Sequence, residues 1–220
     1  MKIHHHPSDA LLLDYATGAL GEAWSLAVAT HLALCPDCRR AVSAIETLGG
    51  NLLDSIAPEP VSTSTFDALM TRLDAEPAAR DAPTPVANPA TLPLVLPEPL
   101  RSYVGGDAAT LPWKRLGLGA YQLPIATGGN GATARLLRIP AGRPVPAHSH
   151  RGLELTLVLC GAFSDATGNY ARGDLQEADE NLEHKPHAAP GEDCICLAVT
   201  DAPLRFCSIA ARLVQPLLGI

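Results

Sequence analysis

The sequence predicts two domains of different class, an all-α domain followed by an all-β domain. Up to about residue 75 the apolar residues recur at helical spacing, whereas the later apolar runs alternate or are β-branched and are separated by glycine-rich turns. Several short strands at regular spacing favour an all-β sandwich or a small barrel. Between the two patterns, residues 76–99 hold seven of the twenty prolines and no helical period, which is typical of an extended linker. We therefore expect domains at 1–75 and 100–220.

The composition is that of a globular chain, with 47% hydrophobic and 18% charged residues in a length of 220. A formal net charge of −7 offers no basic field to phosphates, so we expect no direct binding of nucleic acid. No signal peptide is visible, and no apolar run is long enough to span a bilayer. We therefore expect a cytoplasmic protein with no membrane contact, whose six cysteines serve metal or redox chemistry before structural disulfides.

The acidity is concentrated in the first domain. Residues 1–75 carry four basic side chains against nine carboxylates, whereas residues 100–220 carry eleven of each sign. An acidic surface favours docking on a basic one. We therefore expect a basic protein partner to bind the helical domain.

Four helices are predicted in the first domain. Ser8 is placed to cap the first, "EAWSLAVATHLAL" forms the second, and Pro36 begins a third that we expect to end at Gly49–Gly50. The fourth, over 63–75, carries an apolar stripe at i, i+3, i+4 and i+7 spacing, formed by Phe66, Leu69, Met70 and Leu73. In the second domain, strands are predicted for "ATARLLRI", "LELTLVL" and "CICLAVT".

The stretch "HLALCPDC" indicates a metal site in the helical domain. His31 and Cys35 lie one helical turn apart, and Cys38 falls in the first turn of the helix that begins at Pro36. Imidazole and thiolates are the ligands that zinc prefers, in tetrahedral geometry. A C-x2-C pair can alternatively be a redox pair.

A structural zinc site normally has four protein ligands, so one is missing from this stretch. No further cysteine lies in the helical domain, and its other histidines are His4, His5 and His6. His6 is the nearest to the first helix and the best candidate for the fourth ligand. The alternative is that the three histidines are the remains of a purification tag.

Residues 1–75, with this motif and an upstream histidine, resemble the zinc-binding domain of anti-sigma factors. The resemblance implies a small helical bundle that wraps around an extracytoplasmic-function (ECF) sigma factor and blocks its contacts with RNA polymerase. The helix at 63–75 would then belong to the clamp on the sigma factor. Alternatively, its apolar stripe only closes the core of the bundle.

A second set of ligand types follows in the stretch from Gly142 to Gly161, which reads G-x5-H-x-H-x3-E-x6-G. Its members are His148, His150 and Glu154. The two histidines have strand parity, so their rings point to one face, and a turn at 151–152 can return Glu154 on a neighbouring strand. With His184 downstream, three imidazoles and one carboxylate suit zinc, iron, manganese or nickel.

This second pattern resembles the cupin barrel. The first cupin motif matches in full, whereas the second is degenerate: Gly173 and His184 fit, but the usual proline and glycine before the histidine are absent. The resemblance implies zinc or another divalent metal at His148, His150, Glu154 and His184. His187 is a competing ligand, and a barrel whose polar interior is merely hydrogen-bonded is the alternative.

The order of the two patterns resembles the ChrR-type anti-sigma factors, and the likeness covers nearly the whole chain. That family is associated with responses to singlet oxygen and organic hydroperoxides. The resemblance implies a negative regulator of transcription rather than an enzyme. Its helical domain would sequester an ECF sigma factor in a 1:1 complex, and its cupin would sense oxidative stress and trigger release.

Two questions stay open at the level of sequence. A cupin with three histidines and a glutamate can also hold a metal with open positions, as oxygenases and isomerases do, which would make the helical domain an accessory module. Cys194 and Cys196 alternate in "DCICLAV" and face the same side of one strand. They are interpreted as ordinary buried cysteines, with oxidant sensing as the alternative.

Overall fold

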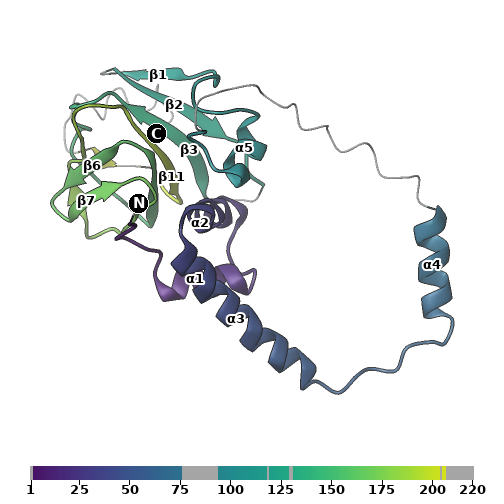
Figure 1. The fold of residues 1–220 in the computed structure, drawn as a ribbon. Helices are drawn as coiled ribbons and strands as arrows, with labels where there is room; N and C mark the ends of the chain where they lie inside the picture. Colours follow the sequence, from purple (N-terminus) through teal and green to yellow (C-terminus); the bar gives the residue numbers. More distant parts are fainter. Residues whose placement is uncertain (1, 76–93, 118, 129–130, 204, 207–220) are drawn as a thin grey trace. The chain divides into compact units, whose positions relative to one another are not determined.

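A computed structural model describes residues 2–75, 94–117, 119–128, 131–203 and 205–206 (Figure 1). Helices occupy the N-terminal part and strands the C-terminal part, so the predicted order of an all-α and an all-β region is confirmed. Among the described residues, those up to 46 and those from 94 onward form one compact unit, and residues 47–75 belong to a second. The boundaries expected at 75 and 99 stay a prediction, because most of the expected linker, residues 76–93, lies outside the described residues.

The first helices begin and end close to where the sequence places their caps. Helix α1 (Asp9–Ala16) is capped by Ser8, whose hydroxyl accepts a hydrogen bond from the Leu11 N–H. Helix α2 (Glu22–Leu34) ends at Cys35, and α3 (Pro36–Asp54) starts directly afterwards with proline at its first position. The chain therefore changes direction at Cys35, between two helices.

Helix α3 does not end at Gly49–Gly50, so that prediction was wrong. It continues to Asp54, and neither glycine adopts the left-handed conformation that ends a helix. Each glycine costs a helix interior about 1 kcal/mol but does not forbid the helical backbone. None of the helices in the described residues is long and apolar enough to cross a membrane.

The largest sheet has six strands in the order β1-β2-β3-β11-β5-β8, all antiparallel. The three predicted strands are present and form its centre, as β3 (Thr133–Ile139), β11 (Cys194–Thr200) and β5 (Glu154–Cys160). The outer strands are β1 (Lys114–Gly117), β2 (Ala120–Ile125) and β8 (Leu175–Ala178). The short helix α5 (Glu98–Val104) precedes this sheet.

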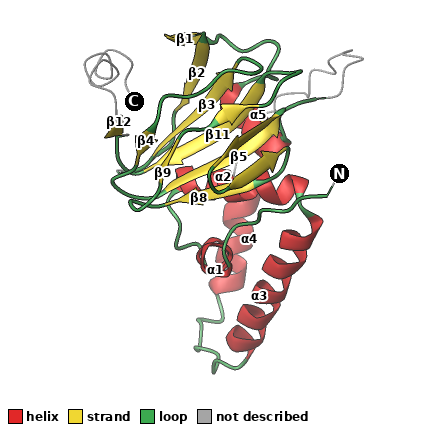
Figure 2. Ribbon diagram, turned by 90° about the vertical axis from the view of Figure 1, so that its left-hand side faces the viewer, coloured by secondary structure: helices red, strands yellow, loops and turns green. Residues whose placement is uncertain are grey.

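Two smaller antiparallel sheets complete the β-rich region; β6 and β7 of one are labelled in Figure 1, and β12, β4 and β9 of the other in Figure 2. One has the order β10-β6-β7, formed by His187–Ala188, Ala162–Asp165 and Gly168–Ala171. The other has the order β12-β4-β9, formed by Arg205–Phe206, His148–Ser149 and Glu183–His184. Of these strands, the sequence indicated only β4, through the strand parity of His148 and His150, because strands this short carry no recognisable period.

Strands β5 and β11 are buried on both faces, because each face packs against a different partner. On one face, Leu157 and Leu197 join a core that includes Leu26 and Val28 of α2. On the other face, Val158 packs in a second cluster with Phe163 of β6. Helix α2 contacts both β5 and β11, so the helical region and the barrel share one hydrophobic core.

The second unit consists of the end of α3, the connection to α4, and α4 itself (Thr65–Ala75). No side chain of α4 is buried within the described part of the chain. Apolar side chains are exposed along the whole of 47–75, namely Leu48, Leu52, Leu53, Ile56, Val61, Phe66, Leu69, Met70 and Leu73.

Candidate metal sites

The junction of α2 and α3 brings the first group of predicted ligands together. His31 lies in the last turn of α2, Cys35 is the residue directly after α2, and Cys38 lies in the first turn of α3. His6 reaches them from the segment before α1. The Nδ1 atom of His6 lies 3.4 Å from the Cys35 Sγ and 3.3 Å from the Cys38 Sγ, and the His31 Nε2 lies 3.3 Å from the Cys38 Sγ. His6 is thus the one of the three N-terminal histidines that joins this group.

The spacing of these four atoms fits one metal ion. They all lie within 4.8 Å of one another. A tetrahedral zinc ion holds its nitrogen and sulfur ligands about 3.5 Å apart, which is close to the observed nitrogen-to-sulfur distances. Two thiols and two imidazoles are also a donor set that zinc prefers. We call this group the Cys2His2 site.

The surroundings of the Cys2His2 site determine the protonation states of its buried residues His31 and Cys38 in the metal-free protein. Burial lowers the pKa of His31 to about 4, so its ring is neutral near pH 7. Its Nδ1–H donates to the Gly173 carbonyl at 2.9 Å, which leaves Nε2 free of a proton and directed at the thiols. Burial and a hydrogen bond with Cys35 raise the pKa of Cys38 to about 12. A bound cation would displace that proton.

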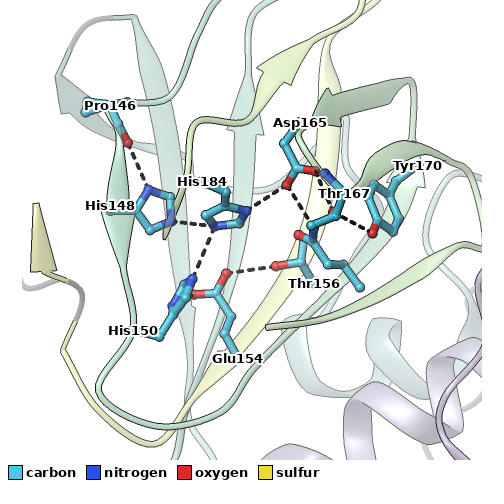
Figure 3. A network of polar contacts seen from close by, with 10 residues as sticks. Pro146, His148, His150, Glu154, Thr156, Asp165, Thr167, Tyr170 and His184 are labelled. Carbon is cyan, nitrogen blue, oxygen red and sulfur yellow. Dashed lines mark hydrogen bonds and ion pairs between the residues drawn. The ribbon is translucent and has the colours of Figure 1, made fainter. Parts of the chain in front are cut away.

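The second group of predicted ligands lies between two sheets of the barrel (Figure 3). His148 and His184 pair across β4 and β9, and His150 follows β4. Glu154 begins β5, which belongs to the six-stranded sheet. The sequence placed Glu154 on a strand neighbouring β4, and this detail was wrong because the turn at 151–152 leads the chain from one sheet to another.

The four side chains of this group are buried and converge on one point. The Nε2 of His184 lies 3.1 Å from the Nε2 atoms of both His148 and His150, and all four ligand atoms fall within 4.8 Å of one another. Bonds of about 2.1 Å at right angles would set two nitrogens about 3 Å apart, so the group fits one ion. We call it the barrel site. His187, the competing ligand, is exposed, and its Nδ1 bonds the Ala188 carbonyl instead.

Two histidines of the barrel site are oriented by acceptors behind them (Figure 3). The Nδ1–H of His148 donates to the Pro146 carbonyl at 2.8 Å, and that of His184 donates to Asp165 at 2.7 Å. Burial alone would raise the pKa of Asp165, but hydrogen bonds from Gln176, Thr167 and His184 hold it at about 2. Asp165 is therefore an anion that fixes the tautomer of His184.

Asp165, the last residue of β6, was not predicted as a functional residue from the sequence. In the sequence, Asp165 is distinguished only by its position in the turn-forming stretch "SDATGN". An aspartate in such a stretch is expected for the turn alone, since its side chain can cap the backbone there. The structure shows that it caps Thr167 in this way and also reaches His184.

Burial also determines the protonation of the barrel ligands in the metal-free protein. It lowers the pKa of His148 and of His150 to about 4, which keeps both rings neutral near pH 7. It raises the pKa of Glu154 to about 7, against the opposing effects of Thr156 and Arg135. Neutral imidazoles are the form that binds a metal, and an ion at this point would favour the ionised carboxylate.

Cys194 and Cys196 lie on β11, and Cys194 packs in the cluster that contains Val158 and Phe163. Both are buried, and both carry free thiols. A hydrogen bond with Cys194, together with burial, raises the pKa of the Cys196 thiol. The thiolate is the reactive form, so this environment makes Cys196 a poor nucleophile. This environment is consistent with the interpretation of both cysteines as buried small side chains.

Comparisons with known proteins show similarity along the whole chain. A family model described as the ChrR cupin-like domain matches residues 102–203. The chain is 50% identical over 220 residues to the anti-sigma-E factor ChrR of Cereibacter sphaeroides, which is all of this chain and all of that protein. A chain in the crystal structure of Rhodobacter sphaeroides SigE in complex with the anti-sigma ChrR superposes with a TM-score of 0.78 at 47% identity, and the match covers 91% of this chain and 100% of that chain. The predicted resemblance is thus confirmed for the helical region and the barrel together.

Proposed function

Because the chain belongs to the ChrR family of anti-sigma factors, we propose that it sequesters an ECF sigma factor in a 1:1 complex and so represses transcription from that factor's promoters. Two similarities support this function. The anti-sigma-E factor ChrR is 50% identical over its full length, and a chain that is 47% identical was crystallised in a complex with SigE. The protein is then a regulator, and an enzymatic role for its barrel is not favoured.

The observation in the structure that carries this proposal is the exposed apolar surface of residues 47–75. Side chains of this size are seldom left in water over so long a stretch unless a partner covers them. Phe66 is 68% exposed and Leu69 is 50% exposed, although their helical spacing suits burial. The stripe on α4 is therefore assigned to the sigma factor rather than to the core of a bundle. The acidic balance of 1–75 suits a basic partner surface.

Zinc is the metal proposed for the Cys2His2 site, with His6, His31, Cys35 and Cys38 as ligands. A site closed by four protein ligands is typical of structural zinc, which stabilises a fold without reacting. The ion would supply a cross-link among the N-terminal segment, α2 and α3. Of the residues of α3, all of which the structure describes, only Cys38 and Val42 are buried, so the attachment of α3 to the rest of the fold would depend on metal binding.

The barrel site is proposed to hold zinc or another divalent metal through His148, His150, Glu154 and His184. Three imidazoles and one carboxylate leave coordination positions for a small molecule. We assign to this site the reception of singlet oxygen or a related oxidative signal, which would trigger release of the sigma factor. A sigma factor acts on RNA polymerase, so the proposed function places the protein in the cytoplasm.

The test is binding of the full chain to an ECF sigma factor of the same organism, measured by size-exclusion chromatography and in vitro transcription. We expect a 1:1 complex that is lost when a chelator removes zinc and is restored when zinc returns. Cys35→Ala should abolish binding, whereas His148→Ala should preserve binding and lose the response to oxidant. A zinc-free protein that binds the sigma factor as tightly as the zinc form would contradict the proposal.

A further inference from the structure

The segment that carries His6 is held by the barrel. It runs along β8, the last strand of the six-stranded sheet, and the Leu175 N–H donates to the His5 carbonyl at 3.1 Å. The backbone N–H groups of His4 and His5 both donate to one oxygen of Asp174, at 2.7 and 2.9 Å. The two residues before His6 are thus fixed by residues of the barrel.

Two further contacts hold the same segment. The Ser8 N–H donates to Glu177 of β8 at 2.6 Å. The ring of His5 packs on that of Tyr170, with 4.3 Å between the ring centroids. His6 itself is exposed, so burial does not fix its ring. Its approach to Cys35 and Cys38 is therefore determined by the backbone on either side, and that backbone is anchored to the barrel.

The other imidazole of the Cys2His2 site depends on the same stretch of barrel. The acceptor for the His31 Nδ1–H is the carbonyl of Gly173, the residue directly before Asp174. Hydrogen bonds to the non-ligating nitrogen set the ring orientation of a metal-binding histidine. Both histidines of the site are thus positioned by residues 173–175, whereas both cysteines are positioned by α2 and α3.

We propose that the barrel segment Gly173–Leu175 determines the metal affinity of the Cys2His2 site, with Asp174 as the positioning residue for His6. The inference rests on the proposed function in that it takes the Cys2His2 site to bind metal. It adds a physical link between the halves of the molecule. Displacement of this segment would take His6 away from the ion and remove the acceptor that orients the His31 ring, whereas the two cysteines would stay in place.

The position of β8 makes it a direct connection between the two sites. Its side chain Gln176 donates to Asp165 at 2.8 Å, and Asp165 orients His184 of the barrel site. Two residues before Gln176 in the chain, Asp174 holds the N-terminal segment. A change at the barrel site that moves β8 would therefore also move Asp174. The hydrogen bonds of Asp174 to the backbone of His4 and His5 would pass this movement on to His6.

The experiment titrates the full-length, metal-free protein with Co²⁺ and follows the thiolate-to-cobalt charge-transfer band. This band reports the Cys2His2 site alone, because the barrel site has no thiolate ligand. We expect Asp174→Ala to raise the apparent Kd by about 10–100-fold, the usual effect of removing a group that orients a ligand. Asp174→Asn, which keeps an acceptor oxygen, should give a smaller loss. The d–d bands of Asp174→Ala should change as His6 leaves the ion.

The matched control is Asp107→Ala. Asp107 also accepts two backbone N–H groups, from Val95 and Leu96, but it does not contact the N-terminal segment. Its removal should leave the band and the Kd unchanged. In a His6→Ala background, Asp174→Ala should add no further loss, because its effect passes through His6. Additive losses, or an Asp174→Ala protein that binds Co²⁺ like the parent, would overturn the inference.

Asp174 also accepts from the Ala171 N–H within the barrel, so thermal unfolding must show that Asp174→Ala stays folded. If it does not, Glu177→Ala is the decisive variant, since Glu177 is exposed and, among the described residues, its carboxylate accepts from the Ser8 N–H. A weaker Co²⁺ affinity supports the inference, and an unchanged affinity overturns it. Absence of the charge-transfer band from the parent protein would instead contradict the metal site of the proposed function, so the two failures are distinguishable.

Discussion

His184 donates from Nδ1 to the carboxylate of Asp165 over 2.7 Å, and the two side chains are 1% and 0% exposed. A buried carboxylate in contact with an imidazole increases the electron density at the opposite nitrogen, which here faces the barrel site. Hydrogen bonds from Gln176 and Thr167 keep this carboxylate in one orientation. The orientation of the His184 ring is therefore determined before any ion binds.

We predict that Asp165→Asn weakens metal binding at the barrel site by about tenfold or more, because the neutral amide cannot support the imidazole to the same degree. Isothermal titration of the metal-free protein measures the affinity. Asp107→Asn is the control, since the carboxylate of Asp107 accepts hydrogen bonds from the backbone N–H groups of Val95 and Leu96. An equal affinity in the Asp165→Asn protein would show that the contact does not orient His184 for an ion.

We predict that Leu69→Asp weakens sigma-factor binding by at least tenfold, because a charge is placed on the apolar surface assigned to the partner. Leu13→Asp is a close control, since Leu13 on α1 is 49% exposed and Leu69 is 50% exposed. Both proteins should keep the parent's thermal stability. Surface plasmon resonance with the full chain gives the two affinities, and equal losses in both variants would reject the assignment of the stripe on α4.

We predict that Gly161→Ala destabilises the protein by about 3 kcal/mol, and Gly142→Ala by about 1 kcal/mol. Both glycines have a positive φ, of 64° and 68°. A methyl group at 161 would lie 2.7 Å from the Asp193 carbonyl oxygen, whereas one at 142 would meet nothing within 4 Å. Urea unfolding of the two variants separates the steric cost from the conformational cost, and equal values would show that the barrel relaxes around residue 161.

We predict that zinc binding at the Cys2His2 site releases protons near pH 7 and weakens as the pH falls. The Cys38 thiol has its pKa raised to about 12, so it keeps its proton in the metal-free protein, and zinc must displace that proton. Each unit of acidification therefore favours the metal-free form. A dye assay in weak buffer counts the protons, and Cys38→Ser should release fewer. Release that does not differ between parent and variant would contradict this protonation state.

The ligands in contiguous motifs could be predicted from the sequence. His31, Cys35 and Cys38 follow one another at helical spacing, so local geometry alone brings them together. His148 and His150 are similarly close in the chain. His6 was identified only because the helical region lacked a further ligand, and its place beside the thiols depends on contacts with β8.

The groups that position those ligands could not be predicted from the sequence. Asp165 and Asp174 act on histidines far away in the chain, and no spacing rule relates them. The partner of α2 was hidden for a different reason. Its sequence "EAWSLAVATHLAL" is apolar nearly all round, so no stripe indicates which face is covered by the sheet.

The contact of α2 with β11 also bears on the order in which the protein can fold during synthesis. The ribosome completes α2 long before Cys194–Thr200, which form one of the two strands that cover it. During that interval Leu26, Val28 and their neighbours have no partner strand to pack against. The first unit therefore completes its fold only when nearly the whole chain has been made, and the nascent α2 is a segment that chaperones are expected to bind.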